Sequence, residues 1–343
     1  MPPSLFPDVP SAPRLIGIAR LASEGSSLRE GHNVEYFTLP VRSVLNRCTS
    51  RRQMPFTWTI NPYRGCEFAC KYCYARYTHE FMEMRDGVAF EQKIFVKQHA
   101  ASLLRQELRQ VKPGEEIAIG TATDPYQPAE KRYQVTRALL EEFARHRSLS
   151  LGIITKSDLV LRDLELLREI GLHNRLSVTL TVTTVNTDLA RLLEPRAPRP
   201  DLRLEAVRRL NQAGIPTGVS CCPVIPGITD SVSSLDAVVE AAARAGARHI
   251  FTNPLFLKPC SEAVFLPFLE KEFPALAASY RERYNGNAFL PPAYGKRISQ
   301  LMARLREKHG MARDARRHSP PDHAQLSADE QLNLFAPAPR RTA

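Results

Sequence analysis

Residues 61–76 of this 343-residue chain read Asn-Pro-Tyr-Arg-Gly-Cys-Glu-Phe-Ala-Cys-Lys-Tyr-Cys-Tyr-Ala-Arg. Three cysteines, Cys66, Cys70 and Cys73, stand in this stretch with the spacing Cys-x3-Cys-x2-Cys. Thiolates are the ligands that iron–sulfur clusters and zinc prefer. A structural metal site is normally closed by four protein ligands, and this loop supplies three. The spacing therefore predicts a cluster in which one iron stays open to a small molecule.

A structural zinc site is the alternative, because zinc accepts three sulfurs and one nitrogen. His79, six residues after Cys73, would be its fourth ligand. Cys48 is a second candidate for a fourth ligand, but a lone cysteine is most often a small buried or half-buried residue.

The loop resembles that of the radical SAM superfamily, whose members hold a [4Fe-4S] cluster with a Cys-x3-Cys-x-aromatic-Cys motif. Tyr72 supplies the aromatic residue. A narrower similarity, over roughly residues 40–310, is to the branch grouped with spore photoproduct lyase as "DNA repair photolyase-like" proteins. The phrases that carry it are NPYRGC at 61–66, YCYAR at 72–76, THE at 78–80, TATDPYQPAE at 121–130, ITKSDLVLRD at 154–163, LEPRAP at 193–198, PVIPGITD at 223–230 and AYGKRIS at 293–299.

The resemblance implies a radical enzyme. Each of the three cysteines would bind one iron, and the fourth iron would chelate the amino and carboxylate groups of S-adenosylmethionine (SAM). One electron, from a donor such as flavodoxin or ferredoxin, would then cleave SAM to a 5′-deoxyadenosyl radical that abstracts a substrate hydrogen. The protein's share of such chemistry is positioning and the exclusion of water.

Further contacts to SAM are expected from residues that follow the strands. Family members often bind the SAM ammonium with Gly-Gly-Glu after the second strand, where this chain has Thr121, Thr123 and Asp124 instead. Asp124 also suits a turn before Pro125.

The third and fourth strands add three more candidates. The resemblance places a SAM-carboxylate lysine at Lys156, with the hydroxyl of Ser157 beside it, although Lys156 also suits a solvated loop. Thr181 matches a ribose-binding position, but threonine is also a common strand former.

On the substrate side, Arg76, Glu194 and Arg196 would suit an anionic group or, equally, ion pairs that hold loops. Spore photoproduct lyase returns a hydrogen atom from a cysteine after its second strand, a place without a thiol here. Cys221 and Cys222 are the candidate substitutes, or plain core cysteines. The missing thiol argues against simple repair of a thymine photoproduct.

The amino-acid composition indicates the compartment and the class of partner. Hydrophobic residues make up 43% of the chain and charged residues 24%, which is typical of a soluble protein. The chain contains no apolar run of about 18 residues and no apolar leader at its start, so we expect no membrane span and no secretion. Seven cysteines, three of them on one loop, indicate metal use in a reducing, cytoplasmic compartment. The net charge of +11 favours nucleic acid as a partner.

Short apolar runs alternate with helical patterns after residue 55, which predicts an α/β fold built from βα units. We expect strands at 56–60, 116–121, 149–155, 176–183, 217–222 and 249–253, and helices near 97–111, 133–146, 160–170, 201–213 and 231–245. The helix at 201–213 would place Leu202, Ala206, Val207 and Leu210 on one face, with Arg203 elsewhere. Six strands fit the partial (β/α)6 TIM-type barrel that the resemblance implies, with its chemistry at the carboxyl ends of the strands.

The chain divides into four predicted parts. Residues 1–54 form a loose N-terminal arm (1–35) and a lead-in, and 55–256 form the radical SAM barrel. Residues 257–310 form a C-terminal helical extension that closes its open side, and 311–343 a disordered basic tail. The tail contains Gln331-Leu-Asn-Leu-Phe335, which resembles the peptide that binds the bacterial sliding clamp. Leu332, Leu334 and Phe335 of this peptide could instead dock on the protein's own surface.

The sequence therefore favours two functions. The first is a SAM-cleaving radical enzyme that acts on nucleic acid. The second is a non-enzymatic nucleic-acid-binding protein, stabilised by zinc or a cluster and recruited by the sliding clamp.

Overall fold

A computed structural model describes residues 15–31, 34–48 and 54–311. Its larger sheet has seven strands in the order β11-β10-β9-β8-β7-β4-β3. Six of them are parallel neighbours, as predicted: β4 (Trp58–Ile60), β7 (Glu116–Ile119), β8 (Ser150–Thr155), β9 (Arg175–Thr181), β10 (Thr217–Val224) and β11 (Ile250–Pro254). The seventh, β3 (Leu45–Arg47), pairs antiparallel with β4 at the edge. The strand order confirms the partial barrel.

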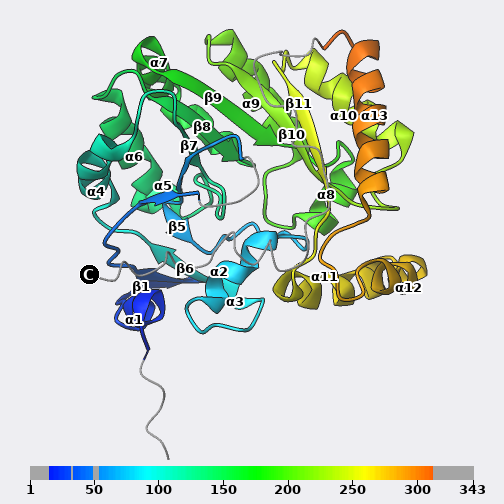
Figure 1. Ribbon diagram of the computed structural model, residues 1–343, viewed down its shortest axis with the longest axis horizontal. Helices are drawn as coiled ribbons and strands as arrows, with labels where there is room; N and C mark the ends of the chain where they lie inside the picture. The colour runs from blue at the N-terminus through cyan, green and yellow to red at the C-terminus, as the bar shows by residue number, and fades with distance from the viewer. Residues whose placement is uncertain (1–14, 32–33, 49–53, 312–343) are drawn as a thin grey trace, which may run out of the picture.

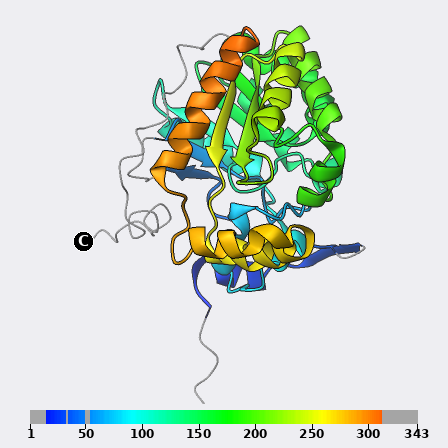
Figure 2. The same ribbon diagram turned by 90° about the vertical axis from the view of Figure 1, so that its right-hand side faces the viewer.

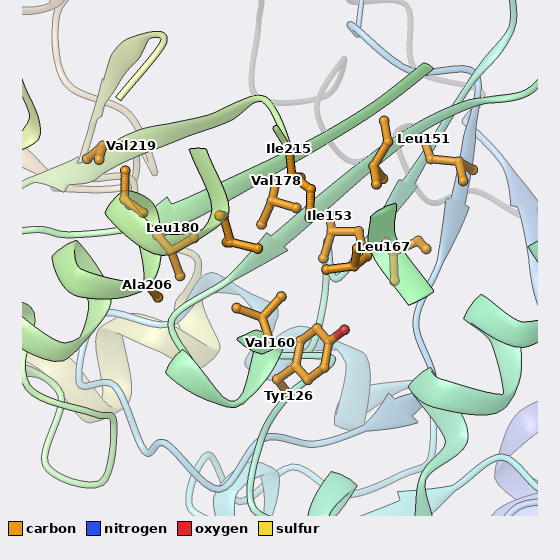
Figure 3. Packing of buried hydrophobic residues seen from close by; sticks show 14 of the residues in the cluster. Tyr126, Leu151, Ile153, Val160, Leu167, Val178, Leu180, Ala206, Ile215 and Val219 are labelled. Atoms are coloured by element: carbon orange, nitrogen blue, oxygen red, sulfur yellow. The ribbon is translucent and has the colours of Figure 1, made fainter. Parts of the chain in front are cut away.

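Helices follow the strands and form an outer layer around the sheet (Figure 1). They are α4 (Ala100–Glu107), η2 (Leu108–Gln110), α6 (Val135–Ala144), η3 (Asp158–Asp163), α7 (Leu164–His173), α9 (Pro200–Gln212) and α10 (Val232–Arg244). Strand β9 is buried at every position after Arg175, because parallel strands of such a fold are covered on both faces. Figure 3 shows the resulting core, in which Val178 and Leu180 lie among the side chains of neighbouring strands and helices.

Helix α9 turns a different face to the core from the one predicted. Leu202 is 43% exposed, whereas Arg203 is 1% exposed and lies with Ala206, Val207 and Leu210 on the buried face. The spacing 203, 206, 207 and 210 is itself a good helical stripe, and hydrophobicity alone hid it because its first member is an arginine. A charged side chain can be buried there because it has an acidic partner, described below.

The prediction of a loose arm over residues 1–35 is wrong for the part that the structure describes. Helix α1 (Gly17–Ser23) is followed by β1 (Ser27–Gly31) and β2 (Val34–Thr38). These strands join β6 (Lys93–Val96) and β5 (Tyr63–Arg64) in a second sheet of order β1-β2-β6-β5. Strand β2 pairs with β6, almost sixty residues later in the chain, so its local sequence carries little of the information that makes it a strand.

The predicted C-terminal helical extension is confirmed as α11 (Pro259–Glu272), α12 (Pro274–Arg283) and α13 (Pro292–Lys308). Helix α13 lies along the β11 edge of the large sheet and beside α10, while α11 and α12 form a layer below its carboxyl ends (Figures 1 and 2). Ile298, Met302 and Leu305 join α13 to the core. The extension therefore covers the open side of the partial barrel.

Two sequence predictions concern membranes and the tail. Within the described ranges, no helix has the length and apolarity needed to span a bilayer. Residues 312–343, with the peptide Gln331–Phe335, lie outside the described residues.

Candidate cluster and cofactor site

The cysteine loop begins where the chain leaves the large sheet. After β4 the chain enters β5 of the small sheet, and Cys66, Cys70 and Cys73 follow before the short helix η1 (Tyr74–Arg76). Gly65 opens the loop with φ +85°, and a Cβ there would lie 2.7 Å from the Lys93 carbonyl oxygen. Only glycine fits this entry. Because the loop follows β4, it lies at the carboxyl edge of the parallel strands.

Gln127 holds the first half of the loop. Its Nε2 donates to the Gly65 carbonyl at 3.1 Å and to Thr123 Oγ1 at 2.9 Å, and its Oε1 accepts from the Glu67 amide at 3.0 Å. Glu67 in turn accepts from the Ala129 amide at 2.7 Å and from the Tyr36 hydroxyl at 2.8 Å. The loop is thereby tied both to the segment after β7 and to the small sheet.

Arg76 holds the second half. Its buried guanidinium donates to the Cys70 carbonyl at 3.0 Å and pairs with Glu91 at 2.6 Å, which lies in α3 (Ala89–Gln92). The sequence left open whether Arg76 binds an anionic substrate or holds a loop, and its contacts are those of a residue that holds a loop.

The three thiols stand in an apolar shell. Cys70 is buried, Cys66 and Cys73 are half-buried, and all three are free. They share one apolar cluster with residues of the C-terminal extension such as Phe265 and Tyr280. Burial raises the pKa of Cys66 well above its usual range and that of Cys70 to about 12, so a bound metal's positive charge is needed to stabilise the thiolates.

Three thiols on one short loop fit a cluster, since each cysteine would bind a different iron. The fourth ligand that a zinc site would need is engaged elsewhere. His79, the predicted zinc ligand, lies in α2 (Tyr77–Glu80) between Phe90 and Phe95, with Nε2 3.0 Å from the Lys93 carbonyl oxygen.

Cys48 is also excluded as a fourth ligand. Its amide donates to the Thr57 carbonyl at 2.7 Å, just before β4 begins. The cysteine loop comes after the opposite, carboxyl end of β4, so the strand separates the two.

Asp124 locks the segment after β7 to the end of β8. Its Oδ1 accepts from Thr155 Oγ1 at 2.6 Å and from the Tyr126 amide at 2.9 Å, and its Oδ2 accepts from the Lys156 amide at 2.7 Å. Burial raises the pKa of Asp124, while these hydrogen bonds lower it. Both oxygens have partners within the protein, which fits the turn-forming role better than capture of the SAM ammonium.

A buried polar network stands behind the loop. Glu194, which follows α8 (Thr187–Leu193), accepts from the Tyr72 hydroxyl and pairs with Arg203 of α9 at 2.5 Å. Lys156 Nζ lies 5.8 Å from the centroid of the Tyr72 ring. Burial opposes the charge on Lys156, but the nearby carboxylate of Glu194 favours it and raises its pKa, so the side chain is a cation at the rim of the loop.

The comparisons with known proteins agree with this geometry. Residues 60–245 match the family model described as "Radical SAM superfamily". The chain belongs to the radical SAM superfamily. Membership implies a [4Fe-4S] cluster and SAM, which the donor set described above fits.

Relatives of this radical SAM protein extend the match beyond the barrel. An uncharacterised protein of Mycobacterium tuberculosis is 35% identical over 297 residues, which is 86% of this chain and 86% of that protein. An uncharacterised protein of Methanocaldococcus jannaschii is 32% identical over 173 residues, covering 50% of this chain and 62% of that protein.

Solved structures show the same fold. Spore photoproduct lyase complexed with dinucleoside spore photoproduct matches with a TM-score of 0.60 at 16% identity, covering 88% of this chain and 85% of that one. A mutant of that lyase with bound AdoMet and the same dinucleoside also gives 0.60, at 15% identity over 80% and 79%.

The remaining candidates in this radical SAM site fall into two groups. Thr123 donates to the Gly65 carbonyl at 2.6 Å, and Ser157 caps η3 by accepting from the Leu159 amide at 3.2 Å, so both hydroxyls support loops. Thr121 accepts from Asn61 at 3.3 Å and Thr181 stands buried at the end of β9, with its carbonyl accepting from Arg203. All four residues lie at the carboxyl edge, where the resemblance put them.

The two candidate hydrogen donors, Cys221 and Cys222, differ in burial. Cys221 is fully buried in the core cluster. Cys222 is half-buried and accepts from the Asn253 amide at 3.1 Å. Burial raises the pKa of Cys222 to about 11, so its thiol stays protonated. A protonated thiol can act as a hydrogen donor, and Cys222 is the more exposed of the two.

Sequence reasoning missed the residues that hold this radical SAM site together. Gln127, Glu67 and Arg203 are buried polar side chains with partners from distant segments. Gln127 stands inside the TATDPYQPAE phrase and Glu67 next to Cys66, so their position beside the motif was the available signal.

Proposed function

We propose that this protein is a radical SAM enzyme that abstracts a hydrogen atom from a nucleic-acid substrate. Cys66, Cys70 and Cys73 would hold a [4Fe-4S] cluster, and SAM would bind at its open iron. Together they supply, after one-electron reduction, the 5′-deoxyadenosyl radical. The observation that carries the proposal is the cation Lys156 at the rim of the buried cysteine loop, beside Tyr72 and Cys70.

The chain's own residues would bind and shield SAM. Lys156 offers an ammonium group for the SAM carboxylate, an ion pair that is strong where water is scarce. Glu194, paired with Arg203, accepts a hydrogen bond from Tyr72 and so fixes the ring that lies 5.8 Å from the Lys156 ammonium. The apolar cluster shared by the loop and helices α11 and α12 would keep water from the radical.

Two features support nucleic acid as the substrate. The chain carries a net charge of +11, which favours binding to phosphates through counterion release. The lyase of the same fold was solved with a dinucleoside photoproduct bound. The place after β7 has no thiol in this chain, so we propose a lesion or modified nucleotide other than the spore photoproduct.

Two partners complete the proposal. A one-electron donor such as flavodoxin or ferredoxin would reduce the cluster. The sliding clamp would bind residues Gln331–Phe335 and so bring the enzyme to replicated DNA.

The proposal is tested by anaerobic reconstitution of the protein with iron and sulfide. We expect about four irons per chain, by the cluster type, and release of 5′-deoxyadenosine from SAM after addition of a reductant. Cys70→Ala should give neither. Ultraviolet-irradiated and undamaged oligonucleotides, single- and double-stranded, are then compared for their ability to accelerate SAM cleavage.

The outcomes separate the two levels of the proposal. A protein with a full cluster that neither binds nor cleaves SAM would refute the enzymatic function. A protein that cleaves SAM but responds to no nucleic acid would refute only the substrate.

A further inference from the structure

A pocket of about 450 Å³ lies where three segments meet. They are the turn after β10, helix α12 and the start of α13 (Figure 1). Its volume falls within the range of small-molecule sites, about 300–1,000 Å³. Leu276, Tyr280 and Leu290 of its lining belong to the apolar cluster that also contains the three cysteines, but none of its lining residues is a candidate ligand of SAM or the cluster.

The floor of the pocket is apolar and fixed. Leu276, Tyr280 and Leu290 contribute to it, and the Tyr280 hydroxyl donates to the Pro226 carbonyl at 2.6 Å. Gly227 has φ +72°, and a Cβ there would lie 3.1 Å from the Leu276 side chain, so glycine keeps this wall open. An apolar, partly aromatic floor suits the flat face of a base or the carbon face of a sugar.

The acidic residue of the pocket is already neutralised. Asp230 Oδ1 accepts from the Gly227 amide at 2.8 Å, and Oδ2 accepts from the Tyr294 hydroxyl at 2.9 Å and from Arg297 at 3.3 Å. Its charge is matched by that of Arg297, so this pair contributes no net charge to the pocket.

One cation and one hydroxyl remain for a ligand. Arg283 lines the pocket at the end of α12 and has no ion-pair partner among the described residues. Ser279, one turn earlier on α12, is half-buried and has no hydrogen-bond partner within that same part of the chain. Residues four apart on a helix face the same side, so both groups point to one place.

We infer that this pocket binds a nucleotide, with its phosphate at Arg283 and Ser279 and its nucleoside against Leu276, Tyr280 and Leu290. Arginine suits phosphate because its planar fork donates two parallel hydrogen bonds. The nucleotide can be free or one unit of a nucleic-acid strand, since both present the same phosphate and nucleoside. Binding here needs neither the cluster nor SAM cleavage, so its failure is distinguishable from failure of the proposed function.

The test is calorimetric titration of the holoprotein, with SAM in excess to fill the cofactor site. The probes are 2′-deoxycytidine 5′-monophosphate, 2′-deoxycytidine and a ten-residue oligodeoxycytidylate. We expect Arg283→Ala to weaken phosphate-bearing probes about tenfold or more, the effect of losing one charge-assisted pair. Arg281→Ala is the matched control, because Arg281 is exposed on the same helix but pairs with Glu270.

Each outcome decides. Arg283-dependent binding of the monophosphate, with the nucleoside at least tenfold weaker, supports the nucleotide site and a free ligand. Arg283-dependent binding of the oligonucleotide alone supports the site as part of a strand-binding surface. Equal binding by wild type and Arg283→Ala, equal binding of nucleoside and monophosphate, or no binding of any probe would overturn the inference. A Ser279→Trp variant, which fills the pocket, should lose the same binding.

Discussion

Glu194 and Arg203 form an ion pair in which the side chains are 0% and 1% exposed, 2.5 Å apart. Arg203 also donates to the carbonyls of Pro198 and Thr181, so its other donors have partners. Replacing Arg203 by methionine would leave a buried carboxylate without its counter-charge. We expect the free energy of unfolding to fall by about 3–5 kcal/mol, measured by urea denaturation.

Two further variants test this explanation. Glu194→Leu combined with Arg203→Met should recover most of the loss, since neither member of the pair is then left buried without the other. Arg208→Ala, which breaks the exposed pair with Glu205 on the same helix, should leave stability close to wild type. A double variant no more stable than Arg203→Met would show that shape, not charge, decides at this position.

Lys156 is the residue that we propose binds the carboxylate of SAM. Its conversion to methionine keeps the length and packing of the side chain but removes the cation near Tyr72. We expect the Kd for SAM to rise about tenfold or more, with cluster content unchanged. Equilibrium binding under anaerobic conditions measures this, and Lys156→Arg should retain part of the affinity. Unchanged SAM affinity in Lys156→Met would place the carboxylate elsewhere.

At the scale of elements, the entry to the cysteine loop depends on Gly65. A Cβ there would meet the Lys93 and Phe90 carbonyl oxygens at 2.7 and 2.9 Å, in addition to the cost of a positive φ. Gly114 has a similar φ, +87°, but a Cβ there would meet nothing within 4 Å. Gly114→Ala should therefore cost only about 1–2 kcal/mol of backbone strain. Gly65→Ala should lower the free energy of unfolding clearly more than Gly114→Ala does, and it should lower the iron content after reconstitution. Equal losses of stability in the two variants would contradict the steric clash between a Cβ at position 65 and the two carbonyl oxygens.

Helices α4 and α6 are joined by a cluster of charges that gives a pH dependence. Hydrogen bonds lower the pKa of Glu142 to about 2. The Arg105 side chain donates the bond with the largest effect, and His146 and Arg145 donate bonds with smaller effects. The stabilisation is complete above the usual pKa of a glutamate, about 4.5, and is lost as the pH falls towards 2. Wild type should therefore lose more stability than Glu142→Gln between pH 4.5 and 2 in urea denaturation. Parallel pH profiles of the two proteins would contradict this assignment.

What the sequence could predict follows the range of the interactions involved. Most of the six parallel strands were predictable because they are largely apolar segments that lead to amphipathic helices, as β7 leads to α6, β8 to α7 and β10 to α10. Strand β2 was not, since its partner β6 comes much later in the chain. Likewise the spacing of the three cysteines identifies their motif in the sequence. The pairing of Glu194 with Arg203 could not be predicted, because it forms only when α8 and α9 bring the two residues together.

At the scale of the whole molecule, the barrel, its small sheet and its extension act as one support for the carboxyl edge. The small sheet reaches the cysteine loop through Tyr36 and Glu67, and α11 reaches it where the Ser261 hydroxyl donates to the Cys73 carbonyl at 2.9 Å. Residues from both ends of the folded chain therefore hold the loop. We therefore expect SAM cleavage to depend on the barrel, the small sheet and the extension, whereas binding to the sliding clamp need not depend on them.

The peptide Gln331-Leu-Asn-Leu-Phe335 allows this separation to be tested. If its apolar residues fill a groove of the sliding clamp, replacing Leu334 and Phe335 by alanine removes the anchors and should weaken clamp binding at least tenfold. Fluorescence anisotropy with a labelled bacterial clamp measures the affinity, and Leu326→Ala, in the same tail outside the peptide, is the control. SAM cleavage should be unchanged in both variants, because none of the cofactor contacts described above involves the tail. Clamp binding that survives the double replacement would remove this peptide as the recruiting segment and leave the radical chemistry untouched.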